Sequence, residues 1–147
     1  MSRSEKALGI FSEGANCAQA VLASFTDETH IDRADSMKIA ASFGGGIKQA
    51  LACGAVTGAL MVLGMRYGCT DHTNMKEKAR ITAITRDFQA RFVAKHGSLS
   101  CKDLLGVNIS TKQGHDEAAA RGLFKSECTR FVASAVEILE EMAGQTM

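Results

Sequence analysis

Apolar residues recur along most of the chain at the three- and four-residue spacing of amphipathic helices. The pattern predicts helices over residues 4–12, 17–25, 34–43, 53–66, 74–95 and 127–142, with short helical turns over 101–105 and 116–122. The segment 53–66 is apolar nearly all round, which is typical of a buried central helix. Strand-forming residues do not alternate, proline is absent, and residues 106–114 are the most loop-like. We therefore expect an all-α fold, a compact multi-helix bundle around the helix over 53–66.

Composition favours a single globular domain that binds neither nucleic acid nor a membrane. A chain of 147 residues with 46% hydrophobic residues can bury a large core, so we expect a single helical domain over residues 1–147. The net charge of +1 gives no electrostatic reason for binding nucleic acid or an anionic membrane. No apolar run reaches the roughly 20 residues that cross a bilayer, and no signal-type stretch opens the chain. We expect a cytoplasmic protein with reduced thiols, and leave open whether it forms a homo-oligomer.

Four of the five cysteines follow predicted helix starts. These are Cys17, Cys53, Cys101 and Cys128. Cys17 follows Asn16 and Cys101 follows Ser100, and both Asn and Ser are preferred N-cap residues. The free N–H groups and partial positive charge of a helix start favour a thiolate. Four positive helix ends can meet if thiolates lie among them, so we expect all four to converge at one end of the bundle. This placement indicates redox chemistry or metal binding, although cysteine is also a common small core residue.

Other candidate site residues are glycines, the fifth cysteine and the histidines. The spacing Gly54-x-x-x-Gly58 gives a small-residue helix face, which suits close helix packing and also the close approach of a cofactor. The Gly44–Gly46 triplet can turn backbone N–H groups toward an anion or cluster sulfides. Cys69 lies beyond a helix end, and we expect it outside the site. The four histidines have no chelating spacing, and we expect them at the surface or at helix caps.

The cysteine pattern resembles a known family. A cysteine in an early helix, the run Cys53-Gly54-Ala55-Val56-Thr57-Gly58 and two later single cysteines are similar to the redox-active proteins of the C_GCAxxG_C_C family. The similarity covers almost the whole chain, although the family pattern is written Gly-Cys-Ala and this chain has Cys-Gly-Ala. The resemblance implies a redox role for Cys17, Cys53, Cys101 and Cys128, with an iron–sulfur cluster and a redox partner protein or oxidoreductase.

Three hypotheses follow for this site. In the leading one, the four cysteines ligate a metal centre, most simply an iron–sulfur cluster used for electron transfer. In the second, the protein is a metal-free thiol–disulfide protein, and Cys53 is the first choice for the attacking thiolate. In the third, the cysteines hold a structural zinc ion in a non-catalytic helical protein. No Cys-x-x-Cys motif is present to separate these alternatives, and whether the protein is an enzyme stays open.

Overall fold

Helices dominate residues 1–145, the part of the chain that the computed structural model describes, which confirms the predicted all-α class. The longer helices are α1 (Arg3–Ser12), α2 (Cys17–Ala23), α4 (Arg33–Ile39), α5 (Gly54–Tyr67), α6 (Met75–His96), α8 (Lys112–Ala120) and α10 (Cys128–Ala143). Shorter helices are α3 (Thr26–Thr29), α7 (Cys101–Leu105) and α9 (Leu123–Ser126), and a tight turn, η1 (Gly46–Ala50), precedes α5.

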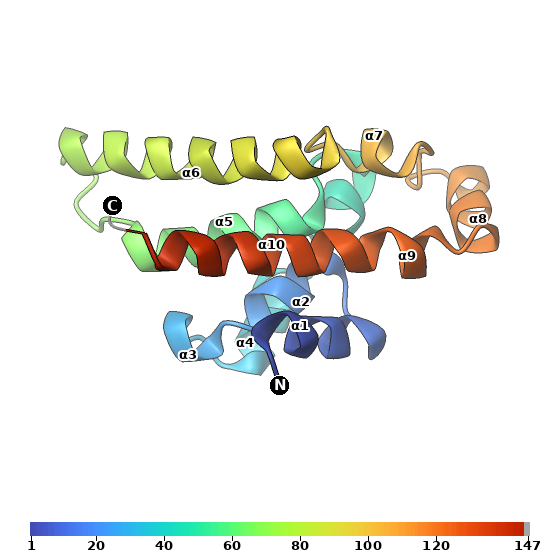
Figure 1. Cartoon of the computed structure of the whole chain (residues 1–147), viewed down its shortest axis with the longest axis horizontal. Coiled ribbons are helices and arrows are strands. Elements are labelled where there is room, and N and C mark those ends of the chain that lie inside the picture. Colours follow the sequence, from blue (N-terminus) through green and yellow to red (C-terminus); the bar gives the residue numbers. More distant parts are fainter. Residues whose placement is uncertain (146–147) are drawn as a thin grey trace.

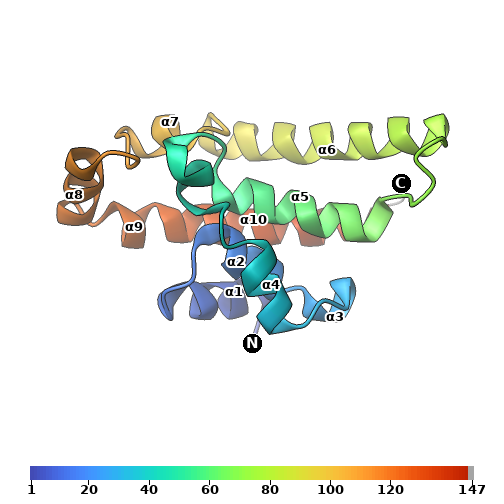
Figure 2. The ribbon, with the colours of Figure 1, turned by 180° about the vertical axis from the view of Figure 1, so that it is seen from behind.

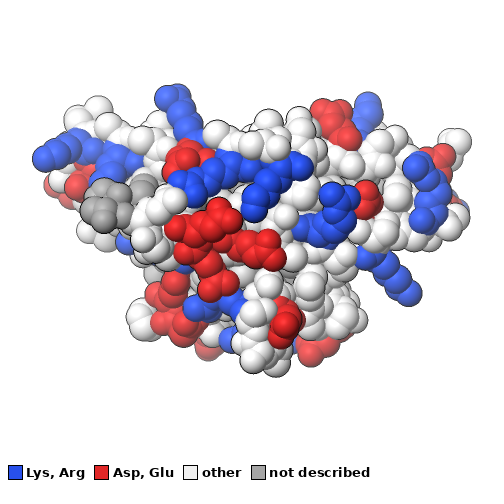
Figure 3. All heavy atoms as spheres, viewed as in Figure 1, with Lys and Arg blue, Asp and Glu red and all other residues white. Residues whose placement is uncertain are grey.

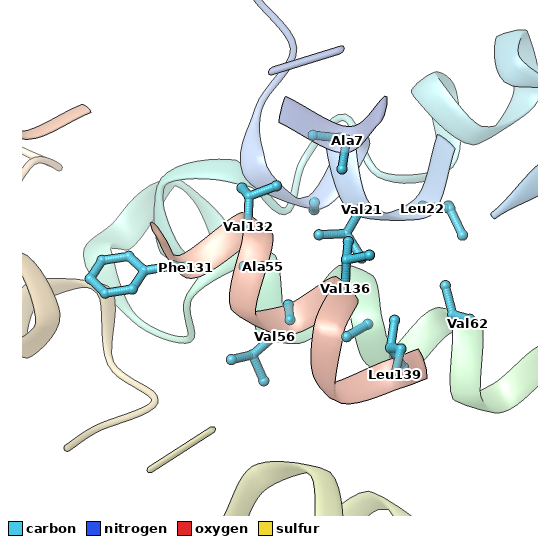
Figure 4. Packing of buried hydrophobic residues seen from close by; sticks show 14 of the residues in the cluster. Ala7, Val21, Leu22, Ala55, Val56, Val62, Phe131, Val132, Val136 and Leu139 are labelled. Carbon is cyan, nitrogen blue, oxygen red and sulfur yellow. The ribbon is translucent and has the colours of Figure 1, made fainter. Parts of the chain in front are cut away.

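The apolar helix α5 is central, as its composition predicts. It contacts α2, α3, α6 and α10. Helices α5 and α10 form a middle layer, with α6 on one side of it and α1 to α4 on the other (Figures 1 and 2). Val56 and Val62 of α5 meet Val136 and Leu139 of α10 in the core (Figure 4). Burying side chains of this size contributes about 1.5–3 kcal/mol each. The core therefore fixes the directions of α5 and α10, which both begin at the same end of the bundle.

Side-chain caps fix where two of the cysteine-bearing helices begin. The Asn16 side chain accepts a hydrogen bond from the Gln19 backbone N–H, and the Gln19 side chain accepts one from the Asn16 N–H. Ser100 caps α7 in the same way by accepting from the backbone N–H of Asp103. Such caps each stabilise a helix start by about 1 kcal/mol. The sequence therefore predicts correctly that Cys17 and Cys101 are first residues of helices.

The structure differs from the predicted elements between α4 and α5. The helix expected over 34–43 ends at Ile39, and the glycine triplet does not stop it. The backbone instead passes through the left-handed region from Gly45 to Lys48, and Ile47 and Lys48 have φ of 61° and 63°. That conformation costs a non-glycine residue about 1–2 kcal/mol, so sequence periodicity gives no indication of it. The turn expected over 116–122 is the helix α8, while α3 and α9 are too short to show a period.

The surface carries mixed charges. Lysines and arginines of α6 lie beside acidic residues of α10 on the face shown in Figure 3. Glu141 of α10, for example, faces Arg91 at 3.8 Å and Lys95 at 3.5 Å. No helix within residues 1–145 is both long enough and apolar enough to cross a membrane.

Candidate functional site

Cys17, Cys53, Cys101 and Cys128 all line one cavity of about 520 Å³, which we call the cysteine cavity. Cys53 immediately precedes α5, and the other three open α2, α7 and α10. Three of the side chains are almost fully buried, with exposed fractions of 4% for Cys53, 8% for Cys101 and 7% for Cys128. Cys17 is half-buried. The structure thus brings together the four cysteines that the sequence singles out, whereas Cys69 is exposed beyond α5.

A short backbone pairing joins the segments of Cys53 and Cys101. An isolated antiparallel bridge links Ala52 to Ser100. On either side of it, the Cys53 N–H donates to the Leu99 carbonyl at 2.8 Å, and the Cys101 N–H donates to the carbonyl of Leu51. Gly46 makes this approach possible, because a Cβ there would lie 2.8 Å from the Cys101 Cβ and 2.4 Å from the Leu51 nitrogen.

Two glycines of α5 allow Cys17 to reach the cavity. A Cβ at Gly54 would lie 3.1 Å from the Cys17 Cβ, and a Cβ at Gly58 would lie 2.8 Å from the Ala18 carbonyl oxygen. The Gly54-x-x-x-Gly58 face therefore packs against the first turn of α2, as its small residues predict. Gly54 also lines the cysteine cavity, so it is placed to meet a cofactor there, whereas Gly58 faces the backbone of α2. The cofactor-binding role predicted for these glycines stays a prediction.

The four sulfur atoms are close enough to influence one another. In each of their six pairings, charge on one thiolate raises the pKa of another. Cys17 and Cys128 interact most directly, and we call them the exchange pair. A hydrogen bond from the Cys17 thiol lowers the pKa of Cys128 and raises that of Cys17 well above its usual value. Burial opposes the first shift and adds to the second.

The expectation that every helix start would stabilise a thiolate is wrong for three of the four cysteines. Burial raises the pKa of Cys53 to about 11, although hydrogen bonds from the backbone of Ala55 and Val56 partly offset it. Burial and the neighbouring Cys53 and Cys128 raise the pKa of Cys101 to about 12. Desolvation outweighs the helix start because few other groups in the cavity can solvate a charge. Cys128 is the cysteine of the site whose pKa is lowered.

The type and number of the cysteines fit a metal centre, but their arrangement in space does not. Four cysteine thiols match the Cys₄ donor set of zinc and iron–sulfur sites. Within residues 1–145, however, no group of three or more His, Cys, Asp or Glu side chains could hold a metal ion as they are arranged. Binding a metal would require the four sulfurs to draw closer together. Cys69 and His72 are both exposed and do not line the cysteine cavity.

Two ionisable residues of the cavity are not predicted by the sequence. Lys48 of η1 and His115 of α8 are exposed at its mouth, and the His115 ring lies 5.0 Å from that of Phe124. The nearest sequence feature that could have indicated Lys48 is the glycine triplet, which lies two residues before it. His30 and His72 are at the surface as expected, while His96 packs between Phe92 and Phe131.

Comparison with known proteins gives one match. The family model described as "Putative redox-active protein (C_GCAxxG_C_C)" matches residues 15–142. These residues include the whole of α2, α5 and α7, most of α10 and all four cysteines of the cavity. No curated protein and no solved structure matches the chain.

Proposed function

Because the chain belongs to the C_GCAxxG_C_C family of redox-active proteins, we propose that it exchanges thiols for disulfides through Cys17 and Cys128. The observation that carries this proposal is that Cys17 and Cys128 line one cavity, where the interaction between their thiols lowers the pKa of Cys128 and raises that of Cys17. A thiolate is the nucleophile in disulfide exchange, so Cys128 is the better attacking group. This assignment favours Cys128 over Cys53, whose thiol stays protonated near neutral pH.

The reaction runs in two displacements. The Cys128 thiolate attacks one sulfur of the substrate disulfide, the S–S bond breaks, and the first substrate thiolate leaves. Cys17 then loses its proton and attacks the Cys128 sulfur of the mixed disulfide, which releases the second substrate thiolate. The substrate gains two electrons and takes up two protons, and the exchange pair becomes a disulfide. An external thiol reductant returns the pair to its dithiol form, as expected in a reducing compartment such as the cytoplasm.

Disulfide mapping tests the assignment. Reduced protein is treated with one equivalent of a thiol oxidant under native conditions, and its peptides are separated by mass spectrometry without reduction. We expect the Cys17–Cys128 link to dominate over the other nine pairings of the five cysteines. In turnover with a dithiol reductant, Cys128→Ser should remove activity by at least about a hundredfold, while the matched exposed variant Cys69→Ser keeps it. A dominant link between Cys53 and Cys101, or full activity in Cys128→Ser, would refute the exchange pair.

A second candidate function is electron transfer through an iron–sulfur cluster on all four cysteines. The convergence of four thiols from four helix starts on one cavity favours it. A bound cluster supplies one-electron chemistry, and a redox partner protein could exchange electrons with it without contacting the sulfurs. Anaerobically purified or reconstituted protein should then be brown, with iron and sulfide in stoichiometric amounts. Colourless protein with one zinc ion would instead support the structural zinc site, and metal-free protein with a Cys17–Cys128 link supports exchange.

A further inference from the structure

We propose that the cysteine cavity accepts a small organic disulfide carrying a carboxylate, with the carboxylate at Lys48 and the sulfurs at the exchange pair. This inference rests on the proposed function and names its substrate class. The substrate takes two electrons from Cys17 and Cys128 and leaves as two small thiols, while the exchange pair becomes a disulfide.

The depth of the cysteines favours a small molecule over a protein disulfide. The attacking Cys128 is only 7% exposed and its partner Cys17 is half-buried, so the exchange pair lies below the protein surface. The volume of about 520 Å³ falls in the range of small-molecule sites, about 300–1,000 Å³. A disulfide in a folded protein is flanked by backbone and neighbouring side chains, which the walls of such a cavity exclude.

Much of the cavity lining is apolar. It includes the half-buried side chains of Phe11, Leu104, Ile109 and Phe124. At the mouth, the exposed lining includes Lys48. An alkyl chain between a sulfur and a carboxylate would therefore contact apolar side chains along its length.

The charges at the cavity favour an anion. Within residues 1–145, the lining contains no aspartate or glutamate, and Lys48 is its one lysine or arginine. Four acidic residues are next to lining residues in the sequence, and three of them pair with cations: Glu13 with Arg33, Asp116 with Lys112 at 2.6 Å, and Glu127 with Arg130 at 3.1 Å. The fourth, Asp103, accepts a hydrogen bond from the Ser98 hydroxyl at 3.4 Å.

The backbone places Lys48 at the mouth despite a conformational cost. Lys48 has φ of 63° and follows Ile47 in the same left-handed region, which disfavours every residue except glycine. Strain of this kind is characteristic of functional positions, where the surrounding structure holds it in place. Here Gly46 is held by the hydrogen bond from Leu51 N–H to its carbonyl at 2.9 Å. The strained turn therefore carries the cation that faces the cavity.

Three disulfides of similar length test the charge preference. Reduced protein is mixed with dithiodipropionate (a dianion), dithiodiethanol (neutral) or cystamine (a dication), and each rate is divided by that of a simple free thiol. We expect the order dianion, neutral, dication. Lys48→Gln should slow the dianion about two- to fivefold, the range of an exposed ion pair, and leave the neutral disulfide unchanged. Lys48→Arg should retain the preference, and the matched control Lys78→Gln on α6, also exposed, should not change it.

Equal normalised rates for the three disulfides would overturn the inference while leaving the exchange reaction intact. So would an identical effect of Lys48→Gln and Lys78→Gln, because it would reflect net charge alone. A binding measurement separates the two proposals if no disulfide reacts. Suberate, the unreactive carbon analogue of dithiodipropionate, should protect Cys128 from alkylation better than octanediol, and should lose this advantage in Lys48→Gln. Protection without reduction keeps the ligand class and rejects the exchange reaction, whereas no difference between suberate and octanediol rejects the ligand class.

Discussion

Gly58→Ala and Gly64→Ala place the same methyl group on one helix in two different surroundings. Both glycines lie in the interior of α5, so each substitution gains about 0.8–1.0 kcal/mol of helix propensity. A Cβ at Gly64 meets no atom within 4 Å, whereas a Cβ at Gly58 would lie 2.8 Å from the Ala18 carbonyl oxygen and 3.2 Å from the Val21 Cβ. These neighbours are backbone and a buried core side chain, which cannot move aside without displacing α2.

The expected magnitudes follow from these contacts. Gly64→Ala should raise the free energy of unfolding by about 0.5–1 kcal/mol. Overpacking at a tight core contact costs about 1–3 kcal/mol, so Gly58→Ala should change stability by between roughly 0 and −2 kcal/mol after the propensity gain. The gap between the two variants, about 1–3 kcal/mol, isolates the packing of α2 on α5 because their helix propensities cancel.

Urea unfolding followed by circular dichroism measures this gap, provided that the slope against denaturant is the same in both variants. Since α2 carries Cys17, displacement of α2 should also lower the yield of the Cys17–Cys128 link in Gly58→Ala but not in Gly64→Ala. If Gly58→Ala stabilised the protein as much as Gly64→Ala does, the close contact between α2 and α5 would not be what holds Cys17 at the cavity.

Two further predictions concern the thiols and the strained turn. The folded pKa of Cys53, about 11, lies above its ordinary value of 9.0, so the unfolded chain ionises first as pH rises and stability falls between about pH 9 and 11. In the reduced protein, ionisation of Cys53 should lower the free energy of unfolding by about 1.4 kcal/mol at pH 10. The Cys53→Ser variant should lack this loss, so equal slopes of stability against pH in the two proteins would contradict the prediction. Lys48→Gly should relieve the left-handed backbone at φ 63° and stabilise the protein by about 0.5–1 kcal/mol, while it removes the preference for dianionic disulfides. Urea midpoints and the normalised rates check both parts, and a destabilised variant would show that the turn is not strained.

Local patterns carry most of what the sequence predicts correctly. The period of the apolar residues identifies α6 and α10, and the nearly uniform apolar composition of residues 53–66 identifies α5 as the central helix. Asn16 and Ser100 mark the starts of α2 and α7, because a cap depends on atoms within three residues of it. The left-handed turn from Gly45 to Lys48 escapes prediction, since its conformation is held by contacts with Leu51 and Cys101 rather than by local preference.

By itself, the sequence places four cysteines at or directly before helix starts, and it shows that the chain holds no Cys-x-x-Cys motif that would pair them. Only the tertiary structure decides that Cys17 faces Cys128, and that burial raises the pKa of Cys53 and Cys101. It also decides that Lys48 lies at the mouth of their cavity. The physical reason is range: a helix start depends on its immediate neighbours in the chain, whereas desolvation and thiol pairing depend on side chains from distant segments. Those segments meet only after Gly46, Gly54 and Gly58 let the backbones approach.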